Sequence, residues 1–190
     1  SKNTPNPFKT LDTIDSVMVL CKSEGKTAVE NTYRVRINSR SSVDFRKNVY
    51  VDGAKLWDEV TPNLYTIKME ISNEDGVLDE TEITSGIRTL SVDSRHGLRV
   101  NGKTVKLRGA CLHHDQGILG AATYDDYEYR RVKRLKEAGF DAVRSAHNPA
   151  SQAILRACDK LGVYVMDELV DVWNKTKVSY DYSVDFMRSW

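Results

Sequence analysis

The chain has 190 residues, a formal net charge of +1, 29% charged residues and 40% hydrophobic residues, which suits a soluble globular protein of one or two domains. So small a charge gives no electrostatic basis for nucleic acid or a membrane surface as a partner. No apolar run approaches the roughly 18 residues of a membrane span. Residues 1–5 carry neither a signal-peptide core nor an initiator Met. We therefore expect a soluble protein of the cytoplasm or periplasm, cut from a longer chain.

The cysteines are odd in number and widely spaced, at Cys21, Cys111 and Cys158. This pattern argues against a disulfide framework and against a zinc site built from cysteine pairs. We expect three buried free thiols, because unpaired cysteine is among the most buried residue types.

The first half of the chain has the pattern of short β-strands separated by turn residues. Residues 1–13 predict a linker. Strands are expected at 16–21, 33–37, 49–51, 64–71, 81–84 and 87–92. Their spacing predicts an all-β, antiparallel, immunoglobulin-like sandwich over residues 1–93. Trp57 is expected in the core or between domains, with a sugar-stacking aromatic as the alternative.

The second half, residues 94–190, changes to a mixed pattern. Asn101-Gly102 predicts a type I′ hairpin turn. Apolar strands are then expected at 105–112, 141–144 and 163–166, with helices at 125–138 and 150–161. Each helix ends at a glycine, which is the βαβ rhythm of a parallel sheet. Oxygens of the segment 123–126 should cap the first helix, and its basic run 130–134 is interpreted as a solvated helix face.

Polar side chains follow each of the three predicted parallel strands. His113 follows the first strand, Arg144 ends the second and His147 follows it, and Asp167 and Glu168 follow the third. Ligands of parallel α/β proteins bind at the carboxyl ends of the strands, so these residues predict one shared site. Arg144 and His147 would face opposite ways if their strand stayed regular, and so would the two adjacent acids.

Two other functions are compatible with these residues. One is a metal-dependent barrel hydrolase, which needs metal ligands that converge on one ion. The residue types it would use are His113, His114, Asp115, His147 and Asp167. The other is a non-enzymatic sugar-binding or interaction module, which predicts glycan binding by residues 1–93 alone.

Several motifs of this chain resemble the glycoside hydrolase family 2 enzymes, the family of β-galactosidases and β-glucuronidases. The most specific is residues 141–149 (Asp-Ala-Val-Arg-Ser-Ala-His-Asn-Pro), followed by residues 158–168. Shorter matches are 56–57 with 62–65, 86–88 and 107–109. Residues 113–117 (His-His-Asp-Gln-Gly) are most similar to the β-galactosidase branch.

The resemblance implies a multi-domain architecture. The family has a jelly-roll domain, an immunoglobulin-like domain and a (β/α)8 TIM barrel, and this chain resembles the second domain plus the first three βα units of an incomplete barrel. The jelly-roll is absent and the sandwich is short between residues 39 and 49. The family's two catalytic glutamates follow the fourth and seventh barrel strands, so we expect them beyond Trp190 and expect the chain alone to be inactive.

The resemblance also implies roles for individual residues. His113 and His147 would hydrogen-bond the sugar hydroxyls, whereas His114 would be structural. Arg144 would support a catalytic glutamate by charge-assisted hydrogen bonding. Asp167 or Glu168 would hold the sugar-binding residues in place without contacting the sugar. Two residues after the third strand, Asp171 and Trp173, would approach the sugar.

The implied substrate is a terminal β-galactoside, with a β-glucuronide or another β-glycoside of the same family as the alternative. No cofactor is required in this chain, and a divalent or monovalent cation could belong to the parent enzyme. Three strands of a barrel leave two open edges, so we expect a homo-oligomer or a strand-borrowing association. Four residues should lose partners that a full barrel supplies: Leu107, Val143, Val163 and Val165.

Overall fold

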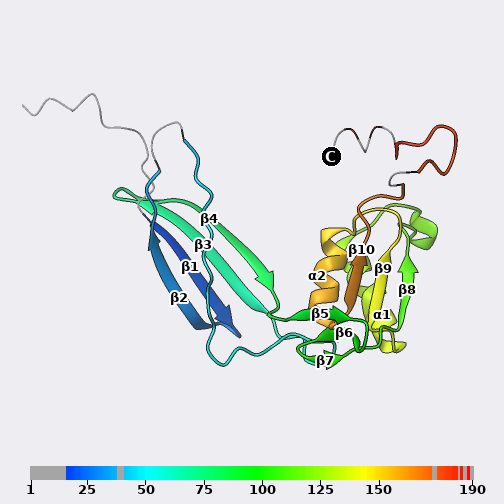
Figure 1. Cartoon of the computed structure of the whole chain (residues 1–190), viewed down its shortest axis with the longest axis horizontal. Helices are drawn as coiled ribbons and strands as arrows, with labels where there is room; N and C mark the ends of the chain where they lie inside the picture. The colour runs from blue at the N-terminus through cyan, green and yellow to red at the C-terminus, as the bar shows by residue number, and fades with distance from the viewer. Residues whose placement is uncertain (1–15, 38–40, 173–174, 184, 186–187, 189–190) are drawn as a thin grey trace, which may run out of the picture. The chain divides into compact units, whose positions relative to one another are not determined.

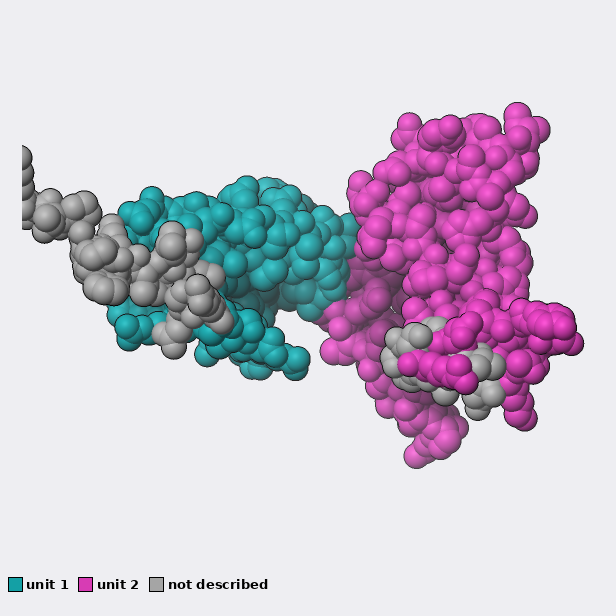
Figure 2. Space-filling view, turned by 90° about the horizontal axis from the view of Figure 1, so that it is seen from above, with its two compact units in different colours: residues 1–55, 64–87 teal, residues 56–63, 88–190 magenta. Residues whose placement is uncertain are grey.

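The computed structural model describes residues 16–37, 41–172, 175–183, 185 and 188. It divides into two compact units, coloured separately in Figure 2. Unit 1 contains residues 1–55 and 64–87, and unit 2 contains residues 56–63 and 88–190. The domain boundary that we expect after residue 93 stays a prediction.

Unit 1 is built on one antiparallel sheet (Figure 1). Its strands are β1 (Ser16–Ser23), β2 (Lys26–Arg34), β3 (Tyr65–Asn73) and β4 (Gly76–Ser85), in the order β2-β1-β3-β4. Alternation places Val19 and Cys21 of β1 opposite Met69 and Ile67 of β3, on the apolar face. Lys68 on the other face pairs with acids of β3 and β4.

The described part of unit 1 shows a single sheet, whereas the predicted sandwich needs two. The strand that we predict at residues 49–51 does not form. Turn-forming residues bound it closely on both sides, and Tyr50 is 76% exposed, so no buried face holds this segment in a ladder. The chain a few residues earlier does contact the sheet, because the ring of Phe45 packs on that of Tyr33 with centroids 5.6 Å apart.

Unit 2 begins with a small antiparallel sheet of β5 (Leu90–Asp93), β6 (Gly97–Val100) and β7 (Lys103–Thr104). Asn101 and Gly102 join the last two strands with φ values of +51° and +79°. Both values lie in the left-handed region that a type I′ turn requires, so this turn is confirmed.

The rest of unit 2 contains the parallel sheet. Its strands are β8 (Gly109–Leu112), β9 (Ala142–Ser145) and β10 (Tyr164–Asp167), in the order β10-β9-β8. The connections carry a 3-10 helix, η1 (Gly117–Leu119), and the helices α1 (Asp125–Glu137) and α2 (Gln152–Leu161), shown in Figure 1. Among the described residues the sheet does not close into a barrel, so β8 and β10 are its edges.

The glycine end of α2 matches the sequence prediction, whereas the start of α1 differs from it. Ser151 caps α2 by accepting from the backbone N–H of Ile154 at 3.2 Å, and Gly162 ends the helix in a left-handed conformation. The N-cap of α1 is Tyr124, and it makes no side-chain capping bond. The predicted capping oxygen belongs to Thr123, which instead donates to the buried Glu128.

Both helices pack on one face of the parallel sheet, where Val132 of α1 and Ile154 of α2 share a buried cluster with Val143. Val143 and Val163 are each 2% exposed, so our expectation that they lose their partners is wrong. The residues left bare are on the opposite face, because side chains alternate along a strand. Cys111, Arg144 and Met166 form one row across that face, and all three are exposed. The expectation of three buried thiols fails at Cys111 for the same reason.

Residues 56–63 close the amino-terminal end of this sheet. Trp57 is 1% exposed, donates its indole N–H to the carbonyl of Asp159 at 2.8 Å, and packs edge-on against Tyr164. Lys136 donates to the carbonyl of Glu59 at 2.7 Å. A buried tryptophan has no free ring face for a sugar, so the stacking alternative is excluded. We call residues 56–63 the clasp.

Candidate functional site

The carboxyl ends of β8, β9 and β10 bring five of the predicted residues together. His113 follows β8 and His147 follows β9, and their ring centroids lie 5.3 Å apart. Both rings are exposed. Glu168 and Asp171, which follow β10, each contact His147. The strand ends therefore form a shared polar cluster, which we call the strand-end cluster: His113, Arg144, His147, Glu168 and Asp171.

Glu168 is the hub of this cluster. Its Oε1 accepts from Nε of Arg144 at 2.5 Å and also pairs with Nη2 of that arginine. Its Oε2 accepts from the backbone N–H of His147 at 2.8 Å. One carboxylate thus fixes an arginine side chain and the backbone of a histidine. These contacts, first with the His147 amide and then with Arg144, hold the pKa of Glu168 below its usual value.

The backbone of His147 explains why Arg144 and His147 share a partner. His147 has a φ of +82°, and β9 ends two residues earlier at Ser145. The strand does not stay regular as far as His147, so the condition for sending the two residues to opposite faces is not met. A left-handed conformation is strained for a residue other than glycine. The bond from its amide to Glu168 compensates for this strain.

Asp171 holds the imidazole of His147. Its Oδ1 lies 2.9 Å from Nδ1 of His147 and accepts from Nζ of Lys177 at 2.6 Å. Its own backbone N–H donates to the hydroxyl of Tyr182 at 3.0 Å. The contacts with Lys177 first, and then with His147, keep the pKa of Asp171 below its usual value. Trp173, the other residue predicted after β10, lies outside the described residues.

Asp167 turns away from the cluster. Its Oδ1 accepts from the backbone N–H of Ala150 at 2.8 Å, just before α2. Asp167 and Glu168 thus bind groups on different sides of their strand, as alternation predicts. Asp115 binds Arg131 of α1 instead of the histidines. The proposed metal ligands do not converge, and no group of three or more suitable side chains in the described ranges could hold a metal ion.

The sequence analysis did not identify two residues that hold parts of this site in place, Lys177 and Glu128. Lys177 was not singled out because it lies ten residues beyond β10, and only the fold of that loop brings it to Asp171. Glu128 is 1% exposed within α1, and its Oε1 accepts from Gln116 at 2.8 Å and from Thr123. It anchors the loop after β8 to α1. A buried glutamate on a helix of mostly polar residues gives no signal in the hydrophobic pattern.

Two family models match the chain. One describes glycosyl hydrolases family 2 and matches residues 13–88. The other describes the TIM barrel domain of the same family and matches residues 92–183. The chain belongs to glycosyl hydrolase family 2. It comprises the immunoglobulin-like domain of this family and the start of its TIM barrel domain.

Similar proteins in the family include both β-galactosidases and β-glucuronidases. A β-galactosidase of Bacteroides ovatus is 37% identical over 175 residues, which cover 90% of this chain and 21% of that protein. A solved family 2 member from Bacteroides cellulosilyticus superposes with a TM-score of 0.86 at 35% identity, covering 92% of this chain and 23% of its own. A β-glucuronidase of Bacteroides uniformis gives 0.77 at 26% identity, covering 90% and 20%.

The chain therefore spans about a fifth of the length of these relatives. The relatives are glycoside hydrolases with different named sugars, so they establish a hydrolase family and leave the sugar open. In the part of the chain that the structure describes, no helix is long and apolar enough to cross a membrane.

Proposed function

We propose that this chain forms part of the sugar-binding wall of a retaining hydrolase that acts on terminal β-galactosides. The observation that supports this proposal is the pair of exposed imidazoles 5.3 Å apart at neighbouring strand ends. Donors and acceptors at this spacing suit adjacent sugar hydroxyls. One of the two, His147, is fixed both at its backbone and at its ring.

The catalytic pair belongs outside this chain in the proposal. Retaining hydrolysis needs two carboxyl groups about 5–5.5 Å apart, one as acid/base and one as nucleophile. The three acids at and just after the end of β10 are each engaged by other groups: Asp167 by Ala150, Glu168 by Arg144 and Asp171 by Lys177. Their contacts support positioning roles, so the chain by itself should not cleave glycosides.

Asp171 selects which nitrogen of His147 reaches the sugar. A carboxylate accepts hydrogen bonds, so the proton of a neutral imidazole would sit on Nδ1, opposite Asp171. Nε2 is then an acceptor for a sugar hydroxyl. The proposed role of Arg144 changes in one respect, since Glu168 already occupies its Nε and Nη2. Among the described residues its Nη1 has only the weak acceptor Sγ of Cys111 at 3.5 Å, and this nitrogen could bind a catalytic glutamate.

The proposal is tested by joining the chain to the remainder of the barrel from the Bacteroides ovatus β-galactosidase. Purified chain and joined protein are each assayed with chromogenic galactoside, glucuronide and mannoside. We expect the chain alone to be silent and the joined protein to cleave the galactoside. Cleavage by the chain alone would show that the acids after β10 include a catalytic group.

β-Glucuronide hydrolysis is the second candidate, because solved β-glucuronidases share this fold segment at TM-scores from 0.71 to 0.77. The same panel separates it from the first candidate. The proposal requires no cofactor in this chain and leaves a cation to the parent enzyme. We also propose that the isolated chain self-associates through the open edges of β8 and β10.

A further inference from the structure

The loop that follows β8 begins with His113, one of the two proposed sugar-binding histidines, and runs to the start of α1 at Asp125. Its one helical turn, η1, contains no buried residue, and Ile118 within that turn is fully exposed. A loop with few buried apolar contacts is free to move unless polar groups hold it. The position of His113 therefore depends on the polar contacts between this loop and α1.

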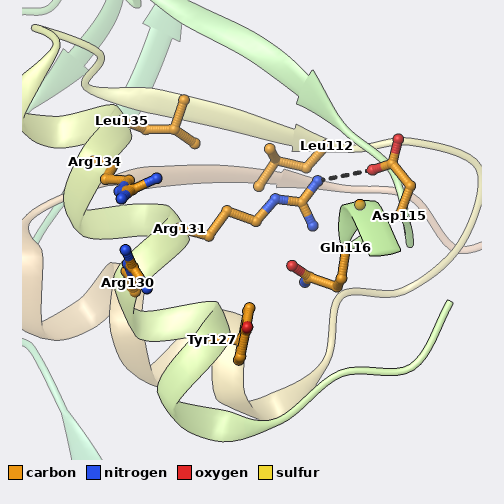
Figure 3. A pocket seen from close by; sticks show the side chains of 9 residues that line it. Leu112, Asp115, Gln116, Tyr127, Arg130, Arg131, Arg134 and Leu135 are labelled. Carbon is orange, nitrogen blue, oxygen red and sulfur yellow. Dashed lines mark hydrogen bonds and ion pairs between the residues drawn. The ribbon is translucent and has the colours of Figure 1, made fainter. Parts of the chain in front are cut away.

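Arg131 of α1 makes the contact that reaches His113. It lies across a groove of about 450 Å³, where its bond to Asp115 at 3.1 Å is visible in Figure 3. The same nitrogen, Nη2, donates to the backbone carbonyl of His113 at 2.9 Å. The side chain of Arg131 is only 19% exposed, so the interpretation of the basic run 130–134 as a solvated helix face is wrong at this position. One guanidinium thus holds the point at which the chain leaves β8.

Glu128 of the same helix holds Arg131. Glu128 is 1% exposed, and its Oε2 forms an ion pair with Nη1 of Arg131 at 4.0 Å. Neither of these two buried atoms has a hydrogen-bond partner in the described part of the chain, so each charge is compensated by the other. The second oxygen, Oε1, accepts from Gln116 at 2.8 Å and from Thr123. Both halves of the loop and the arginine that binds His113 therefore meet at one buried acid.

The anchor of His113 resembles that of His147, whose backbone N–H binds Glu168. In each case a charged side chain binds the backbone of a histidine beyond the end of its strand, and a second charged side chain holds the first. Asp171 also holds the ring of His147, whereas the ring of His113 has no hydrogen bond in the described part of the chain. The placement of the His113 imidazole therefore depends on its backbone anchor.

We infer that Arg131 is a positioning residue of the sugar site. It fixes the backbone at His113 and so keeps this imidazole beside that of His147, and the buried Glu128 keeps Arg131 in place. Both residues act through His113 and do not contact the sugar. The inference rests on the proposed function only in assigning His113 to the sugar, because the spacing of the two imidazoles can be measured without any substrate.

Nuclear Overhauser effects between the ring protons of His113 and His147 test this positioning role in the chain, since the two ring centroids lie 5.3 Å apart. Arg131→Met keeps a long side chain and removes every donor. We expect the inter-ring effect to disappear, while the imidazole ¹⁵N shifts of His147 stay unchanged because Asp171 holds that ring separately. A folded Arg131→Met chain that keeps the inter-ring effect would overturn the inference.

A second variant covers the case in which Arg131→Met does not fold, because that substitution leaves the charge of Glu128 buried without its cation. Glu128→Gln with Arg131→Met removes both charges and keeps an oxygen that can accept from Gln116 and Thr123. This double variant should also lose the inter-ring effect. If the effect stays intact in the folded double variant, Arg131 does not position His113.

Arg156→Met is the matched control. Arg156 of α2 also binds α1, through Asp125 at 2.8 Å, but this contact lies outside the loop after β8. The control should therefore keep the inter-ring effect. Equal losses of the effect in Arg131→Met and Arg156→Met would show a general loosening of α1 and would overturn the inference.

The joined protein shows whether the sugar site depends on this position. The double variant should lower kcat/KM for the galactoside by about 10–100-fold, since displacement of a positioned group by about 1 Å has effects of this size. The control should leave kcat/KM unchanged. Loss of the inter-ring effect without any loss of kcat/KM would also overturn the inference. If the variants lose the inter-ring effect but the unmodified joined protein cleaves no galactoside, the proposed function alone is disproved.

Discussion

The two ends of the parallel sheet in unit 2 differ in how far their residues are buried. At the amino end, the clasp buries Trp57 and binds Tyr164, Lys136 and the carbonyl of Asp159. At the carboxyl end, His113 and His147 stay exposed in a charged cluster. The buried end therefore serves stability and the end with exposed, anchored polar groups suits binding, which is the division found in parallel (β/α)8 barrels.

Removing the centre of the clasp should have the largest effect. Trp57→Ala takes away a fully buried ring and its bond to the Asp159 carbonyl, so we expect a loss of about 3–5 kcal/mol in the free energy of unfolding. Denaturant unfolding measures it. Val60→Ala is the control in the same segment, because Val60 is 79% exposed and should change stability by no more than about 0.5 kcal/mol. Equal losses in the two variants would disprove the clasp.

Gly162→Ala should destabilise the same end through a close approach. An added Cβ would lie 2.7 Å from the carbonyl oxygen of Glu59, and Gly162 has a φ of +69°. We expect the free energy of unfolding, measured by heat or denaturant, to fall by about 2–3 kcal/mol. Gly139→Ala is the matched control, because its φ is +89° but no atom lies within 4 Å. It should lose about 1 kcal/mol from backbone strain alone. The difference between the two variants measures the contact with the clasp.

At the open end, the pH response of Glu168 should reveal its hold on His147. The folded pKa of Glu168 is lowered, so its contacts are complete above the ordinary glutamate pKa of about 4.3 and are lost as the pH falls through the lower folded value. The NMR chemical shift of the His147 amide proton should change with pH as Glu168 is protonated, and the midpoint of that change should lie below the ordinary glutamate pKa. Glu168→Gln should abolish that titration. An amide that titrates at the ordinary value would contradict the hub role.

Asp171→Asn should alter the ring of His147 without unfolding the chain. The amide can donate as well as accept, so the preference for a proton on Nδ1 should weaken, and ¹⁵N chemical shifts of the imidazole should report mixed tautomers. Activity of the joined enzyme should fall by about 10–100-fold. Asp115→Asn, which removes a carboxylate bound to Arg131, is the control and should leave the His147 shifts unchanged. Unchanged shifts in Asp171→Asn would remove this positioning role.

Thiol labelling tests the contrast between buried and exposed residues with the smallest expected effect. Burial raises the pKa of Cys158 to about 12 and also raises that of Cys21, whereas Cys111 is exposed on the bare face of the sheet. Ellman's reagent should therefore modify one thiol in the native chain and all three in denaturant. Cys111→Ser should leave no fast-reacting thiol. A second fast thiol in the native chain would show that a buried region opens, either the apolar face of β1 that holds Cys21 or the helix-facing core that holds Cys158.

Local sequence signals predicted the parts of the fold that depend on a few adjacent residues. The Asn101-Gly102 turn and the Gly162 helix end both follow from backbone preferences of the residues themselves. The three parallel strands and two helices also follow from hydrophobic period and glycine position. The second sheet of the sandwich predicted for residues 1–93 is not seen among the residues of unit 1 that the structure describes, because a strand forms only where a partner and a buried face exist for it.

The sequence by itself determined the βα rhythm, the family motifs and the residue types that end each strand. Tertiary structure alone decided which of those residues meet. Glu168 joins Arg144 to His147 because the chain leaves the regular strand at a φ of +82°. Trp57 closes the sheet from 102 residues before Asp159. Such contacts join segments far apart in the chain, and no local preference encodes them, since each depends on packing that exists only once the whole unit has folded.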